Sequence, residues 1–175
     1  MRNRNGLIQM SRIKMFLLMA WFLMTGINAM SHVSFHNDAD GHYMIDLELI
    51  PNQKGATLYV SFQNQTGDEI PLEAQLLLKL SDGTTLTLKG SCFRIEDRGQ
   101  ELQIAGSTIK PILKISDAKF ELTEEQVAAF QFGIKDFLLN TQVRPTTCHW
   151  NKDKIGVKLF EEFQKARNND FETYF

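Results

Sequence analysis

Period-two alternation of apolar and polar residues is the feature that most constrains the fold of this chain. Every second side chain is apolar in residues 43–50, and the same alternation recurs in 56–62, 74–80 and 86–88. Because successive side chains of a strand point to opposite faces of a sheet, each segment predicts a half-buried β-strand. The Asp82-Gly83 dipeptide between the last two segments is typical of a tight hairpin turn. These patterns predict a sheet built mainly of antiparallel strands.

Two helices are predicted in the C-terminal half of the chain. The segment Thr123-Glu124-Glu125-Gln126 has the capping-box form, and Gly133 is a helix-stop signal. A second helix is predicted to begin near Asn151 or Asp153. Its apolar residues recur at helical spacing and form one stripe: Ile155, Leu159, Phe160, Phe163 and Ala166. We expect this stripe to pack on the β-core.

The fold class follows from the order of these elements. Shorter strand candidates lie at 92–95, 102–105, 113–122 and 134–143. The chain is predicted to be mainly β, as an antiparallel β-sandwich or open barrel of about seven strands. One short crossover helix and a C-terminal amphipathic helix complete it. The expected division is a flexible lead-in at 30–42, a single β-rich domain at 43–168 and a C-terminal tail at 169–175.

An uncharged apolar run at 15–25 follows four basic residues and precedes the small residue Ala29. This order is typical of a secretory signal peptide, which we assign to residues 1–29. The run is short for a membrane span, which needs about 20 apolar residues, although a retained anchor helix is the alternative. The chain is therefore predicted to be exported to the periplasm or the extracellular space, and not to span a membrane after cleavage.

Loss of this leader would change the charge of the protein. The leader carries four basic residues and no acidic one, so its removal takes the formal net charge from −2 to −6. Binding to a polyanion depends on Lys and Arg displacing counterions. An acidic mature chain therefore makes nucleic acid an improbable partner.

Cys92 and Cys148 are the only cysteines, and both lie in the part predicted to be exported. Two cysteines of a small domain in an oxidising compartment most often pair, so a Cys92–Cys148 disulfide is expected. On the chain-entropy model a loop of this length stabilises the fold by roughly 4 kcal/mol. The alternative is a nucleophilic Cys148 activated by His149, although adjacent residues of a strand point to opposite faces.

The segment before the first predicted strand holds three of the four histidines of the chain. In an extended backbone four residues of this segment share a face and could offer ligands to a divalent cation: His36, Asp38, Asp40 and His42. An EF-hand is excluded, because Leu47 stands where the loop needs a bidentate glutamate. The alternative is a polar N-terminus that turns into the first strand.

The familiar catalytic motifs are absent from the sequence. It contains no GxSxG, HExxH, P-loop or GxGxxG pattern. Asp46 and Glu48 share one face of a predicted strand, which is a possible arrangement for glycoside hydrolysis. Such pairs are more often a solvated surface. No cofactor is predicted.

Several segments together resemble a known group of proteins. They are the hairpin at 78–88, the segments 120–126 and 133–135, and Trp150-Asn151-Lys152-Asp153-Lys154-Ile155-Gly156. Over roughly residues 76–165 the chain resembles small exported proteins of unknown function that are common in Bacteroidetes. The resemblance implies an exported β-domain with a helical crossover near its C-terminus, and it implies no catalytic residue.

Two functions from different classes follow. The first is an exported binding or accessory module of the cell envelope, with a protein or a glycan as its ligand. The alternative is a small hydrolase or metal-dependent enzyme that uses the N-terminal His/Asp cluster.

Overall fold

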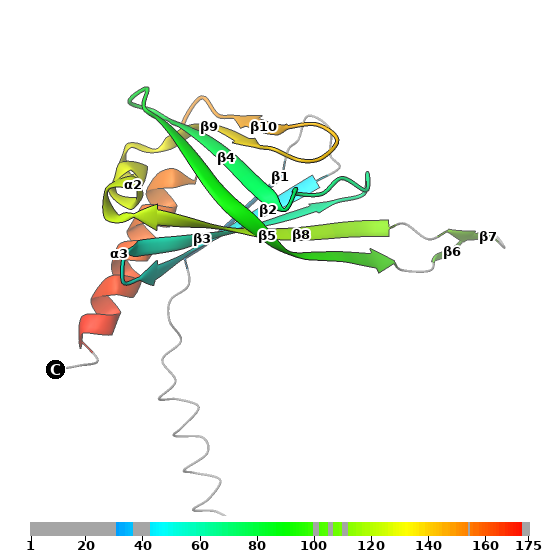
Figure 1. Cartoon of the computed structure of the whole chain (residues 1–175), viewed down its shortest axis with the longest axis horizontal. Coiled ribbons are helices and arrows are strands. Elements are labelled where there is room, and N and C mark those ends of the chain that lie inside the picture. Colours follow the sequence, from blue (N-terminus) through cyan, green and yellow to red (C-terminus); the bar gives the residue numbers. More distant parts are fainter. Residues whose placement is uncertain are drawn as a thin grey trace, which may run out of the picture.

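The computed structural model describes residues 31–36, 43–99, 102–104, 107–109, 112–153 and 155–172. Eight strands form one antiparallel sheet in the order β1-β2-β3-β8-β5-β4-β9-β10. Their bounds are β1 Ser31–His36, β2 Tyr43–Asn52, β3 Gly55–Asn64, β4 Glu73–Leu80, β5 Thr85–Gly99, β8 Ile112–Thr123, β9 Ile134–Leu139 and β10 Thr146–His149. A separate two-stranded ribbon joins β6 (Leu102–Ile104) to β7 (Ser107–Ile109) beyond the far ends of β5 and β8 (Figure 1). The predicted mainly antiparallel β-fold is confirmed.

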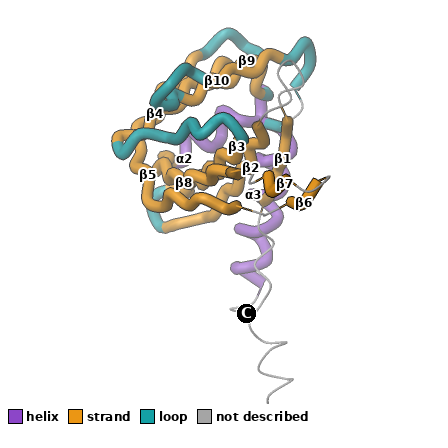
Figure 2. Tube along the Cα trace, turned by 90° about the vertical axis from the view of Figure 1, so that its right-hand side faces the viewer, coloured by secondary structure: helices purple, strands orange, loops and turns teal. Residues whose placement is uncertain are grey.

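The sheet curls into a half-barrel, so the open barrel describes the architecture better than the sandwich. Figure 2 shows the curl as two arms, with β4, β9 and β10 on one side and β8, β3, β2 and β1 on the other. Strand β5 belongs to both arms, because its first half pairs with β4 and its second half with β8. Gly90 lies at the change of partner. A Cβ there would approach the Lys119 carbonyl oxygen to 2.2 Å, so the close approach of β5 and β8 requires glycine.

The concave face of the half-barrel holds a single hydrophobic core. Alternate residues of β2, β3 and β4 point into it, as the sequence pattern predicted, and the largest fully buried side chains include Phe62, Phe120, Phe130 and Phe137. The Asp82-Gly83 turn connects β4 to β5 as a hairpin, which confirms that prediction.

Two helices cover the opening of the half-barrel. Helix α2 (Glu124–Ala129) and the 3-10 turn η1 (Phe130–Phe132) lead from β8 to β9, and the predicted capping box of Thr123 and Gln126 is present. Helix α3 (Gly156–Glu172) follows β10 yet contacts β1, β2 and η1. It therefore joins the two arms of the sheet. None of the helices in the described ranges is long and apolar enough to cross a membrane.

Asp153 fixes the place where α3 begins. One of its carboxylate oxygens accepts from Gly156 N at 2.8 Å and also from Ile134 N, at the start of β9, at 2.7 Å. The other oxygen accepts from Val157 N at 2.9 Å. A single carboxylate thus caps the helix and holds it against the sheet. Gly133 allows this contact, because a Cβ at this residue would lie 2.6 Å from the Cβ of Asp153.

Two boundaries differ from the sequence prediction. Residues 31–36, expected to belong to a flexible lead-in, form the edge strand β1, which pairs with β2 from Ser31↔Leu49 to His36↔Met44. The segment has only two apolar residues at alternate positions, Val33 and Phe35, and its other residues are serine and histidine. This pattern is too short to distinguish a strand from a polar terminus. At the other end α3 runs to Glu172, into the segment expected to be a tail.

Candidate functional site

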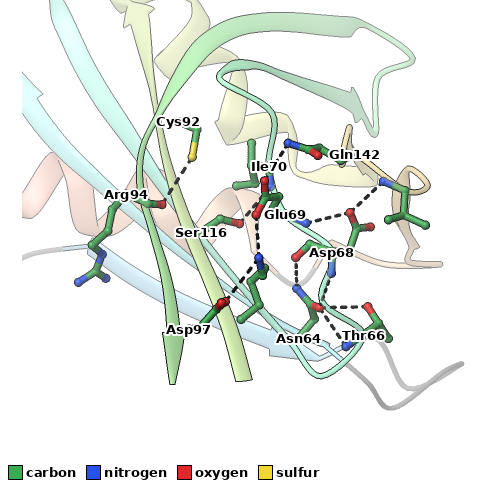
Figure 3. Close-up of polar contacts among 12 residues, drawn as sticks. Asn64, Thr66, Asp68, Glu69, Ile70, Cys92, Arg94, Asp97, Ser116 and Gln142 are labelled. Carbon is green, nitrogen blue, oxygen red and sulfur yellow. Dashed lines mark hydrogen bonds and ion pairs between the residues drawn. The ribbon is translucent and has the colours of Figure 1, made fainter. Parts of the chain in front are cut away.

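The largest polar cluster of the described chain surrounds the connection after β3 (Figure 3). Asn64 accepts from Asp68 N at 3.0 Å and donates to its carbonyl oxygen. The buried Asp68 carboxylate then accepts from Val143 N at 2.9 Å and from the Thr141 hydroxyl at 2.6 Å. Both Asp68 oxygens have donors, so this cluster joins the β3–β4 and β9–β10 connections, and we assign it a structural role.

A second group of charges extends this cluster toward β5 and β8. The Lys114 ammonium lies 2.9 Å from the Glu69 carboxylate and 3.4 Å from Asp97. Hydrogen bonding to Glu69 raises the pKa of Lys114. Because the ammonium already has two carboxylate partners, we assign these residues a structural role as well.

The expected disulfide between Cys92 and Cys148 is not formed in this structure, where both thiols are free. Strands β4 and β9 separate β5 from β10, and the register aligns Cys148 with Phe137, Leu78 and then Leu86. Cys92 lies further along β5. The two thiols also have different partners, since Sγ of Cys92 contacts the Arg94 carbonyl oxygen and Cys148 contacts Tyr43.

Cys148 is also poorly suited to act as a nucleophile. Burial raises the pKa of its thiol to about 11, and a hydrogen bond with Tyr43 offsets part of this effect. Its neighbour His149 points to the opposite face and pairs with Asp136. The sequence argument against a Cys148–His149 pair is therefore supported by the geometry.

The proposed metal ligands lie mostly outside the described residues. Asp38, Asp40 and His42 fall in the segment 37–42, and only the backbone of His36, at the end of β1, is described. The metal site of the N-terminal segment therefore stays a prediction. In the part of the chain that the structure covers, no three His, Cys, Asp or Glu side chains are grouped to hold a metal ion.

A pocket of about 270 Å³ lies on the face of the sheet that points away from the core. We call it the outer-face pocket and define it by its lining: Asp46, Glu48, Tyr59, Val60, Ser61, Phe93, Arg94 and Asp117. It spans four neighbouring strands, because the register aligns Asp46 of β2 with Ser61 of β3, Ser61 with Asp117 of β8, and Asp117 with Arg94 of β5.

A β-bulge shapes one wall of this pocket. The pairing of β5 with β8 shifts between Cys92 and Arg94, so Phe93 is an extra residue without a partner across the ladder. Its ring is 54% exposed and meets the ring of Tyr59 edge to face, with 6.0 Å between the centroids. The bulge thus presents an aromatic surface to solvent beside the polar groups of the pocket.

Asp117 is the most unusual residue of the pocket. Its side chain is 10% exposed, and its Oδ2 accepts from Nε of Arg94. Its Oδ1 is buried and has no hydrogen-bond partner. A buried carboxylate oxygen without a hydrogen-bond donor destabilises the fold by an amount on the order of 1–3 kcal/mol. Such an atom is rare in native folds and is a reason to look for a ligand that supplies the donor.

The Arg94 side chain also lines the pocket and is more exposed than that of Asp117. It is 50% exposed and also lies 3.8 Å from a Glu96 oxygen. Its side chain points away from the polar cluster described above (Figure 3). Arg94 therefore offers guanidinium donors at the surface while it holds one oxygen of Asp117.

Sequence reasoning found only one part of this pocket. Asp46 and Glu48 were singled out as a carboxylate pair on one strand face, and both line the pocket. No sequence pattern pointed to Tyr59, Phe93, Arg94 or Asp117, because these residues meet only through the pairing of β3, β5 and β8. A bulge also has no reliable sequence signal.

Comparison of the chain with protein-family models, with curated proteins and with solved structures gave no match. The resemblance to small exported proteins of Bacteroidetes therefore stays a prediction.

Proposed function

We propose that this chain is an exported binding module of the cell envelope that holds a glycan in the outer-face pocket. The observation that carries the proposal is the half-exposed ring of Phe93 beside carboxylates and a guanidinium in one cavity of about 270 Å³. Export rests on the leader at residues 1–29.

A sugar ring matches this combination of groups. It has a face of C–H groups that packs on an aromatic ring, and an edge of hydroxyls that exchange hydrogen bonds. Phe93 and Tyr59 supply the apolar surface. The carboxylates of Asp46 and Glu48 accept from hydroxyls, and Arg94 donates to oxygen atoms.

The alternative function as a small hydrolase gains one observation. Asp46, Glu48 and Asp117 all line the same pocket, and glycoside hydrolysis needs two carboxylates about 5–10 Å apart. The Arg94 guanidinium already holds one oxygen of Asp117, so this carboxylate is part of an ion pair within the sheet. For this reason we favour binding, and the experiment below also measures cleavage.

The test is a binding screen of the purified exported protein against defined oligosaccharides, followed by titration calorimetry. Phe93→Ala should weaken the binding of any hit at least tenfold. Phe132→Ala is the matched control, because Phe132 is 50% exposed but lies in η1 rather than in the pocket. Absence of any hit, or equal losses in the two variants, would overturn the proposal. Release of reducing ends from a bound glycan would replace it with the hydrolase.

A further inference from the structure

We infer that the sugar unit held in the outer-face pocket carries a free, protonated amino group. This inference rests on the proposed function and specifies its ligand. The first reason is charge. Three carboxylates line the pocket, from Asp46, Glu48 and Asp117, against the single guanidinium of Arg94. A cavity with two excess negative charges attracts a cation and repels an anionic or phosphorylated glycan.

The second reason is the unpaired oxygen of Asp117. Its Oδ1 is buried beside the pocket and lacks a donor, while Oδ2 is held by Arg94. An ammonium group has three N–H donors and no acceptor, so it can satisfy a carboxylate oxygen with a charge-assisted hydrogen bond. Oδ1 has almost no contact with solvent in this structure, so the inference requires side chains around Asp117, such as the half-exposed Arg94, to shift when the ligand binds.

The third reason is that the cation must be organic. The cavity of about 270 Å³ is many times the volume of one water molecule, about 30 Å³, and two aromatic rings form part of its wall. Its carboxylates are not grouped to hold a metal ion, within the described part of the chain. Aromatic faces stabilise an organic ammonium through cation–π attraction. An amino sugar supplies the ring, the hydroxyls and the ammonium in one unit.

The partners of the remaining carboxylates are consistent with this ligand. Asp46 already accepts from the Gln63 amide at 3.0 Å, which orients it. Glu48 has no partner among the described side chains, so it is available to the ligand at the rim of the pocket. Lys119 lies in the neighbouring row of the sheet, where it pairs with Tyr59 across the ladder, and is not part of the lining.

The test compares three probes of equal length: an oligomer of glucosamine, the same oligomer N-acetylated, and a neutral glucose oligomer. Calorimetry at neutral pH should give a dissociation constant at least tenfold lower for the free-amine oligomer. Asp117→Asn and Glu48→Gln should each reduce this preference about tenfold, and Glu73→Gln, an exposed residue of β4 outside the pocket, should leave it unchanged. Glu48 is only partly buried, so its variant stays informative if Asp117→Asn does not fold.

The outcomes separate the two proposals. If the acetylated or neutral oligomer binds as tightly as the free-amine oligomer, glycan binding stands and the amine inference is overturned. If none of the three oligomers binds and the broader screen is also empty, both fail. If an acetylated lysine amide with a free side-chain amine binds as tightly as the glucosamine oligomer, the ligand is a peptide amine and the assignment to an amino sugar is overturned.

Discussion

Replacement of Asp153 by alanine tests how α3 is held against the sheet. The change removes a carboxylate that accepts from four backbone N–H groups, of Ile134, Ile155, Gly156 and Val157. Two of these donors, Gly156 and Val157, belong to the first turn of α3, while Ile155 directly precedes the helix and Ile134 begins β9. The substitution thus removes the helix cap and the bond between helix and sheet at the same time.

The magnitude follows from these two losses. Loss of an N-cap acceptor costs about 1–2 kcal/mol. Ile134 is fully buried, so its N–H loses the Asp153 acceptor without access to water, at a cost of about 1–3 kcal/mol. We expect Asp153→Ala to lower the free energy of unfolding by about 3 kcal/mol. Asp153→Asn retains one accepting oxygen but places an amide N–H₂ toward Val157 N, so about half of this loss is expected.

Urea unfolding followed by circular dichroism measures the effect. With a urea slope of about 1.5–2 kcal/mol/M, Asp153→Ala should lower the midpoint by about 1.5–2 M with the slope unchanged. Asp82→Ala is the control, because Asp82 also accepts from a backbone N–H, at 2.8 Å from Thr84, but in an exposed turn. The reasoning is refuted if Asp153→Ala costs no more than Asp82→Ala, for which we expect less than about 1 kcal/mol.

Three further predictions concern other parts of the fold. Gly90→Ala should lower the free energy of unfolding by about 2 kcal/mol, because the new Cβ would contact the Lys119 carbonyl. Gly99→Ala, on the same strand, is the control: its Cβ meets no atom within 4 Å, so the urea midpoint should not change. Thr123→Ala should cost about 1 kcal/mol through loss of the capping box, and an unchanged urea midpoint would contradict it. Burial raises the pKa of Cys148 from 9.0 to about 11. At pH 8 iodoacetamide should therefore alkylate Cys148 roughly 100-fold more slowly in the native protein than in the unfolded chain. Mass spectrometry measures the two rates, and equal rates would contradict the burial of the thiol. Because the pKa of Cys148 is higher in the folded state, the neutral thiol stabilises the fold fully below pH 9, and this contribution is lost between pH 9 and 11. In the Cys148→Ala variant the free energy of unfolding should therefore change less with pH over this range.

Local patterns were enough to predict most elements of this fold. The alternation in β2, β3 and β4, the Asp82-Gly83 hairpin and the capping box of α2 are each encoded within a few residues. These signals depend only on residues close in sequence, so they predict the element without knowledge of its long-range contacts.

The order of the strands was not predictable in the same way. Strand β8 lies between β3 and β5, which are separated from it by many residues in sequence, and this order brings Asp117 between Ser61 and Arg94. Whether Cys92 and Cys148 meet likewise depends on the register and not on their spacing in sequence, and both thiols are free in the structure. Non-local pairing therefore creates the candidate site.

The contacts of α3 determine when the hydrophobic core can be completed during synthesis of the chain. This helix packs against β1 and β2, the first strands of the described chain, although it follows all the other described elements in sequence. A chain that leaves a ribosome or a translocation channel N-terminus first cannot seal its core until Leu159 and Phe163 have emerged. Contacts between elements so distant in sequence fold slowly, because the loop between them must be ordered first. The apolar faces of β1 and β2 therefore stay exposed until the residues of α3, more than 100 positions later in the sequence, have been synthesised.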